Sequence, residues 1–131
     1  MASELTDFSR LCVHTITTKP WSLEKAIQEY ETAGIKGITV WRQAIEPYGL
    51  DESARMLDGS SLDVVSLCRG GFFPAQTAEK RQSAIDDNRK AVDEAAAIGA
   101  PLIVLVCGAV PGMDLAEARK QIADGIAAVA P

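Results

Sequence analysis

Histidine, cysteine and aromatic residues are scarce in this sequence, and no cluster of positive charge interrupts it. The 131 residues include one histidine, three cysteines and 5% aromatic residues, and the net charge at pH 7 is −5. Proteins that bind nucleic acid usually carry a patch of lysine and arginine, so the sequence disfavours a DNA or RNA partner. With 47% hydrophobic and 24% charged residues, the balance is that of an ordinary globular chain.

Targeting and membrane signals are also missing from the sequence. No basic segment followed by an apolar stretch opens the chain, so no secretory signal is predicted. The longest strongly apolar run, Leu102–Cys107, is far shorter than the about 20 residues that cross a bilayer. We therefore expect a cytoplasmic protein without a membrane anchor.

The cysteines predict neither a disulfide nor a metal site. Cys12, Cys68 and Cys107 form no CxxC pair, and each lies in or at the end of an apolar run. Buried, reduced thiols are therefore the favoured interpretation. No cluster of His, Asp and Glu has the spacing of metal ligands, so we predict no self-contained metal site.

Strand-like and helix-like segments alternate along the chain. Short β-branched and apolar runs predict four strands, at Leu11–Ile16, Gly37–Trp41, Leu62–Cys68 and Pro101–Cys107. Apolar spacings of three and four predict four helices, which run from the N-cap Ser22 to Gly34, from Asp51 to Leu57, from about Thr77 to Gly99, and from Asp114 onward.

The two C-terminal helices have predicted apolar faces. For the helix that begins near Thr77 the face includes Ala84, Ile85, Val92, Ala95 and Ala96. For the last helix it is Leu115, Ala118, Ile122, Ile126 and Val129. Asp114 and Glu117 have the spacing of a capping box, in which each side chain accepts a hydrogen bond from the other's backbone amide.

This alternation predicts an α/β fold with parallel strands and outer helices. An open doubly wound sheet competes with a barrel, but the turn Thr15–Pro20 lacks the glycines that bring a backbone close to a pyrophosphate. Strand starts near residues 11, 37, 62 and 101 fit units of roughly 31 residues, as in a barrel of eight units. We predict that residues 1–131 form a single incomplete domain, the (β/α)4 half of a TIM barrel. Its open edges favour self-association.

Candidate binding residues follow the predicted strands, because TIM barrels bind ligands at the C-terminal ends of their strands. His14 is suited to proton transfer or hydrogen bonding, although a satisfied histidine near the core is an equal alternative. Trp41 and Arg42 could stack on a sugar and grip an anion, whereas rim packing is the alternative. Arg69 precedes two glycines that would allow close approach of a ligand, with Phe72 and Phe73 as pocket walls. A plain turn with a core aromatic is the alternative.

Glu46, after the second strand, is the one carboxylate on this side that could act as a base. A solvated loop residue is the favoured interpretation of it. The catalytic residues therefore remain unassigned in this sequence.

Three runs of sequence resemble a known family. They are Gly34–Arg42, Ser66–Pro74 and Ala97–Val106, and together they resemble the sugar phosphate isomerase/epimerase proteins of the xylose isomerase-like TIM-barrel superfamily. The resemblance extends from Leu11 onward. The run Leu-Cys-Arg-Gly-Gly-Phe-Phe-Pro is fairly specific for one branch, and the other two are generic for the superfamily.

The resemblance implies an isomerase that interconverts a small sugar or hydroxy-carbonyl substrate by metal-assisted proton transfer. It implies a divalent ion, Mg, Mn, Co or Zn, held by Glu, Asp, His and Glu on strands five to eight, so the catalytic residues are expected beyond Pro131. The matching positions are the substrate-side ones: His14, Trp41, Arg42 and Arg69. Relatives include epimerases, dehydratases and a DNA-repair endonuclease, and the acidic charge disfavours the last. The alternative is a non-catalytic half-barrel module that pairs with another half barrel.

Overall fold

The computed structural model describes residues 4–130, and these form a four-stranded parallel sheet in the order β1-β2-β3-β4. The strands are β1 (Cys12–His14), β2 (Gly37–Trp41), β3 (Asp63–Gly71) and β4 (Ile103–Val106). Each strand pairs in parallel with the next one along the chain. This order is that of consecutive units of a TIM barrel, which confirms the predicted α/β half barrel.

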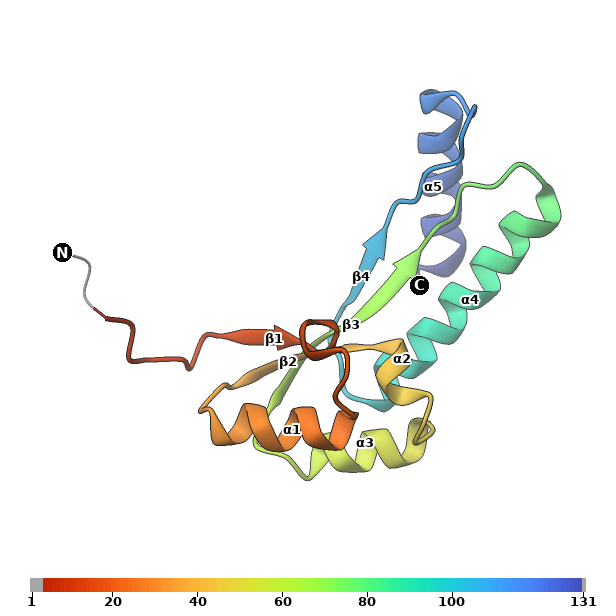
Figure 1. The fold of residues 1–131 in the computed structure, drawn as a ribbon. Helices are drawn as coiled ribbons and strands as arrows, with labels where there is room; N and C mark the ends of the chain where they lie inside the picture. The colour runs from red at the N-terminus through yellow and green to blue at the C-terminus, as the bar shows by residue number, and fades with distance from the viewer. Residues whose placement is uncertain (1–3, 131) are drawn as a thin grey trace.

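Helices connect the strands and lie on one side of the sheet, as Figure 1 shows. They are the 3-10 turn η1 (Thr15–Thr18) and the α-helices α1 (Leu23–Thr32), α2 (Arg42–Ile45), α3 (Leu50–Asp58), α4 (Ala78–Ala97) and α5 (Leu115–Val129). Parallel neighbours joined by right-handed crossovers place their helices on the same face. The other face is the one that lines the interior of a barrel.

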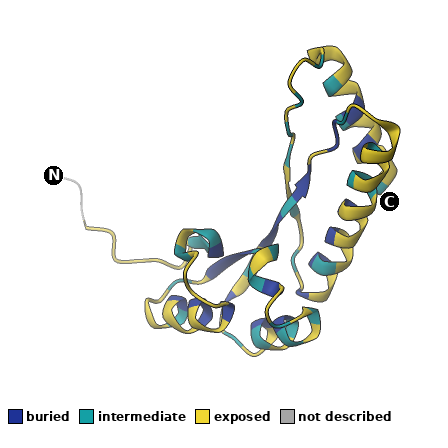
Figure 2. Ribbon diagram, turned by 45° about the vertical axis from the view of Figure 1, so that its right-hand side comes forward, coloured by how far each residue is buried: buried dark blue, intermediate teal, exposed yellow. Residues whose placement is uncertain are grey.

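The core lies between the sheet and helices α1, α3 and α4. Ile38, Val40 and Leu67 point from the strands toward the helices and are fully buried. Tyr30 of α1 and Ala91 of α4 contact the same cluster. Figure 2 shows this burial as dark blue along the middle strands and the inner sides of the helices.

The opposite face of the sheet carries small polar side chains. The hydroxyl groups of Thr39 and Ser66 are hydrogen-bonded at 2.8 Å, and the thiol of Cys12 lies 3.3 Å from the Thr39 hydroxyl. Thr39 and Ser66 are buried, and the hydrogen bonds satisfy them. These contacts join three neighbouring strands through the interior.

The predicted bounds of strands one and three were wrong at their C-terminal ends, the fourth strand is shorter than predicted, and one helix was missed. β1 ends at His14 and not at Ile16, because Thr15–Thr18 turn into a 3-10 helix. β3 continues to Gly71, so Arg69 lies in a strand and not in a loop. The short helix α2 was not predicted, since four residues are too few to show a helical period.

The predicted helix caps agree with the structure. The Ser22 hydroxyl accepts a hydrogen bond from the backbone N–H of Lys25, and Gly34 has a φ of +75°, the left-handed conformation that ends many helices. Asp114 accepts from the N–H groups of Ala116 and Glu117. The reciprocal half of the capping box is absent, because Oε1 of Glu117 instead accepts from the side chain of Gln121.

The apolar faces of α4 and α5 were predicted only in part. Val92 is 44% exposed, whereas Asn88, Ala91 and Ala95 are the buried residues of α4. On α5 the buried residues are Gln121 and Gly125, and Leu115 and Ile126 are exposed. Within residues 4–130, α5 packs through Gly125 on Phe73, and periodicity does not reveal which neighbour a helix meets.

The cysteines differ in exposure. Cys68 is buried, as predicted, Cys12 is half-buried, and Cys107 is exposed. The prediction of burial was therefore wrong for Cys107, which follows the end of β4. Burial raises the pKa of the Cys68 thiol, and the neighbouring charge of Arg69 only partly opposes this. No helix among residues 4–130 has the length and apolarity needed to cross a membrane.

Candidate functional site

The ends of β1 and β2 bring His14 and Trp41 together. His14 is the last residue of β1 and Trp41 the last residue of β2. The indole Nε1–H of Trp41 donates a hydrogen bond to Nδ1 of His14 at 3.2 Å. Both residues were predicted from strand position alone, and the structure places them in direct contact at the C-terminal end of the sheet.

Arg69 lies one strand farther, in an irregular part of β3. The β3–β4 register shifts between Cys68 and Gly70, which makes Arg69 the additional residue of a bulge. Its guanidinium carbon lies 4.1 Å from the centre of the Phe72 ring, a cation–π contact. Bulges re-aim side chains and are frequent beside functional sites.

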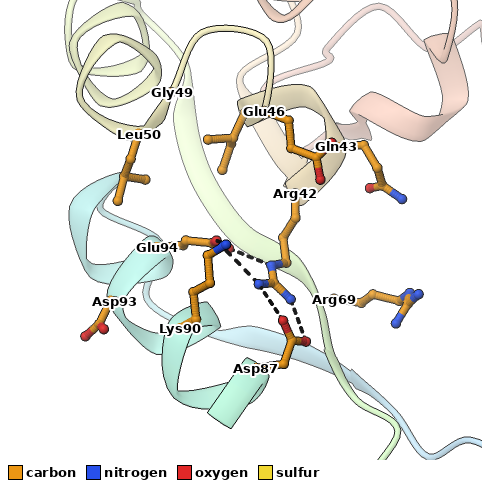
Figure 3. A pocket seen from close by; sticks show the side chains of 11 residues that line it. Arg42, Gln43, Glu46, Gly49, Leu50, Arg69, Asp87, Lys90, Asp93 and Glu94 are labelled. Atoms are coloured by element: carbon orange, nitrogen blue, oxygen red, sulfur yellow. Dashed lines mark hydrogen bonds and ion pairs between the residues drawn. The ribbon is translucent and has the colours of Figure 1, made fainter. Parts of the chain in front are cut away.

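The side chain of Arg42 points toward Asp87 and Glu94 of α4 (Figure 3). Its Nη1 and Nη2 donate to the two carboxylate oxygens of Asp87 at 2.9 and 3.0 Å, and its Nε donates to Glu94. The pKa of Arg42 is raised, since the hydrogen bonds to Asp87 and Glu94 favour the charged form more than burial disfavours it. This geometry favours a structural role for Arg42 over substrate contact.

A cleft of about 500 Å³ surrounds this ion-pair cluster. Its lining includes Arg42, Glu46, Arg69, Asp87, Lys90 and Glu94. Lys90 lies 3.8 Å from Glu94. The positive charges of Arg42 and Lys90 thus balance the negative charges of Asp87 and Glu94. Glu46 is exposed on the rim of the cleft, at the end of α2, in agreement with a solvated residue.

A smaller cleft of about 200 Å³ lies beside Trp41. Trp21, Trp41, Gln43 and Lys19 are among the residues that line it. Trp21 is partly exposed, and the Lys25 ammonium group lies 5.2 Å from the centre of its ring. Trp41 therefore offers its edge to His14 while also lining this cleft.

The glycines after Arg69 serve the protein and not a ligand. A Cβ on Gly71 would lie 2.1 Å from the backbone oxygen of Val106, and one on Gly70 would lie 2.6 Å from Oδ1 of Asn88. The missing side chains thus allow β4 and α4 to approach β3. Phe73 is buried against α5, so only the exposed Phe72 could wall a pocket beside Arg69.

Asn88 is a residue that the sequence analysis missed. Its Oδ1 accepts from the N–H of Gly71 at 2.7 Å, and its Nδ2 donates to the Gly71 carbonyl at 2.8 Å. Asp87 and Glu94, the partners of Arg42, were also missed. Their spacing of seven residues puts both on one side of α4, a signal that could have marked them as partners of a strand-end arginine.

The described residues do not fit a metal ion. Within residues 4–130, no group of three or more His, Cys, Asp or Glu side chains converges on a common point. The carboxylates Asp87 and Glu94 are already bound to Arg42. We therefore assign no metal ligand and no metal-dependent step to this part of the chain.

Parallel βα units in barrel order, with a polar rim at the strand ends, define the class as a TIM-barrel half. The model of the family described as "Xylose isomerase-like TIM barrel" matches residues 27–131. The chain belongs to this family. No curated protein matches the chain.

A solved structure extends the comparison. The chain is similar to the protein SMc04130 from Sinorhizobium meliloti 1021, with 42% sequence identity and a TM-score of 0.84. The match covers 91% of this chain and 44% of that protein. The chain thus spans less than half the length of this relative.

Proposed function

We propose that this chain provides the substrate-binding rim of an enzyme that isomerises or epimerises a small sugar or hydroxy-carbonyl compound. The observation that supports the proposal is the row His14, Trp41 and Arg69, which lie at or within two residues of the C-terminal ends of three adjacent strands. An imidazole, an indole and a guanidinium offer hydrogen bonding, stacking and positive charge to an oxygen-rich substrate. The matched family is consistent with a sugar-modifying enzyme.

The side chains of the described residues determine which part of the reaction we assign to them. In the wider family a divalent ion, Mg, Mn, Co or Zn, supplies Lewis acidity for proton transfer between neighbouring carbons. The residues described here do not fit that ion, so we propose that their part is to bind and orient the substrate. No catalytic base is assigned among them.

A binding titration tests the role of the rim. Addition of D-fructose to the chain is expected to change the tryptophan fluorescence, because Trp41 lies at the site. Arg69→Ala is expected to weaken this binding about tenfold, which corresponds to the loss of about 1.4 kcal/mol. Arg55→Ala, an exposed arginine on α3, is the control. Equal affinity in all three proteins would remove Arg69 from the site.

Turnover is a separate test of the enzyme assignment. A panel of ketoses and aldoses is assayed with a divalent ion supplied and then chelated. We expect no turnover by the chain alone. Turnover that the chelator abolishes would contradict this expectation and would show that these residues assemble a metal site between chains.

A second function, a half-barrel assembly module, is favoured by the exposed apolar surface at the β4 edge. Leu102, Val104 and Leu105 are 52%, 36% and 42% exposed. β1 and β4 are the two outer strands of a fully parallel sheet, so a two-fold related copy could continue each edge and close eight strands. Sedimentation tests the module, because the module requires a symmetric dimer and a monomer would exclude it.

A further inference from the structure

The hydrogen bond between Trp41 and His14 has a fixed direction. An indole N–H can only donate, so Nδ1 of His14, 3.2 Å away, must be the acceptor and carry no proton. In a neutral imidazole the proton then resides on the other nitrogen. His14 is therefore held as the Nε2–H tautomer.

Backbone and side-chain contacts hold both partners in place. The backbone N–H of Trp41 donates to the Thr15 hydroxyl at 2.9 Å, immediately after His14. The Tyr30 hydroxyl donates to the His14 carbonyl at 3.4 Å and lies 2.6 Å from the Thr18 hydroxyl. The end of β1 is thus linked to the end of β2 through Thr15 and to α1 through Tyr30.

The other imidazole nitrogen, Nε2, on a half-buried side chain, has no hydrogen-bond partner among residues 4–130. Every buried side-chain nitrogen and oxygen of this part of the chain, by contrast, has one. Nε2–H is thus an unused donor at the C-terminal end of β1. That end of the sheet is where TIM barrels bind their ligands.

We propose that Trp41 is a positioning residue that engages Nδ1 of His14 as an acceptor and so presents Nε2–H as the donor for a carbonyl or hydroxyl oxygen of the substrate. This inference rests on the proposed function only for the identity of the substrate. In this proposal His14 donates a hydrogen bond to an oxygen of the substrate and does not accept a proton from it. Trp41 then acts mainly through the N–H at the edge of its indole ring. Stacking of the ring face on a substrate is secondary.

Nitrogen NMR of the chain tests the tautomer without ambiguity, because the sequence contains one histidine. With ¹⁵N-labelled histidine, the wild type is expected to show a protonated Nε2 and an unprotonated Nδ1. Trp41→Phe is expected to bring the two ring-nitrogen shifts closer together, because the donor that selects one tautomer is gone. Trp21→Phe, which removes the other tryptophan, is the control and should leave both shifts unchanged.

A second measurement protects the test against a Trp41 variant that fails to fold. The two tryptophans give two indole N–H signals, and His14→Ala is expected to move that of Trp41 and not that of Trp21. A protonated Nδ1 in the wild type, or an unmoved Trp41 signal in His14→Ala, would overturn the pairing.

D-fructose tests the donor role of the same group. Titration of the wild type is expected to shift the Nε2–H signal, and a signal that does not move at the highest concentration would overturn that role. If D-fructose changes neither the tryptophan fluorescence nor the Nε2–H signal, the proposed substrate-binding function fails, whereas the tautomer, measured without ligand, is unaffected. If D-fructose changes the fluorescence and not the Nε2–H signal, only the donor role of His14 fails. The two proposals therefore fail by different observations.

Discussion

Arg42 forms a bidentate ion pair with Asp87, with both carboxylate oxygens within 3.0 Å of the guanidinium. The pair joins the residue after β2 to the middle of α4, which are 45 positions apart in the sequence. Two parallel hydrogen bonds define an orientation as well as a distance. The pair therefore fixes how α4 lies against the C-terminal end of the sheet.

Replacement of Arg42 by methionine should destabilise the chain. The side chains of Arg42 and Glu94 are only 18% and 12% exposed, so the variant leaves a nearly buried carboxylate without its cation. A loss of about 2 kcal/mol in the free energy of unfolding is expected, below the value for a fully buried pair because Asp87 is 56% exposed. Urea denaturation measures it, with Arg55→Met as the exposed control, expected within about 0.5 kcal/mol of wild type. Equal effects of the two variants would contradict a structural role for Arg42.

The same pair predicts a pH dependence of stability. The hydrogen bond from Arg42 holds the pKa of Asp87 below its ordinary value of 3.8, against the opposing effect of burial. A depressed pKa in the folded state adds stability above the unfolded-state pKa, and this stability is lost as the pH falls through the folded-state value. The urea midpoints of wild type and Asp87→Asn should therefore differ at about pH 6. They should converge as the pH falls below 3.8, the ordinary pKa of an aspartate. A difference that widens in acid would contradict the pairing, and Asp93→Asn on the same helix is the control.

Asn88 should be among the most sensitive positions of the chain. Asn88→Ala leaves the N–H and the carbonyl of Gly71 without partners in a buried place. Each unsatisfied group costs about 1–3 kcal/mol, so we expect a loss of about 3 kcal/mol in the free energy of unfolding. Gln82→Ala, on an exposed part of α4, is the matched control. A loss no larger than that of the control would show that water replaces the amide.

The exposed β4 edge predicts self-association. The wild type should sediment as a dimer or larger species, because unpaired strand edges and apolar side chains favour pairing with another chain. Val104→Lys places a charge on that strand and should shift the distribution toward monomer. Val92→Lys, at an exposed position of α4, should not. A monodisperse wild-type monomer would refute the prediction.

The parts of the fold that depend on local signals were predictable from the sequence. β2 was predicted at its observed bounds because Gly37–Trp41 is short, apolar and flanked by polar residues. The caps at Ser22 and Asp114 were predictable because a cap acts within three residues.

The candidate site was harder to predict, because it depends on which helix faces which strand. Strand ends marked His14, Trp41 and Arg69, but neither the Trp41–His14 hydrogen bond nor the Arg42–Asp87 pair has a local sequence signal. Each joins residues 27 or 45 positions apart. Leu115 is a further example. The periodicity of α5 places it on an apolar face but does not tell which element, if any, covers that face, and Leu115 is exposed.

Adjacent residues of α4 hold two different strands. Asp87 binds the residue that follows β2, and Asn88 binds the last residue of β3. One turn of α4 thus bonds to two neighbouring strands at the C-terminal end of the sheet. These bonds hold the strand ends that carry Trp41 and Arg69 in a fixed relative position. The conformational entropy of these strand ends is lost when the chain folds. A ligand that contacts both Trp41 and Arg69 therefore does not have to order them, and its affinity is not reduced by that cost.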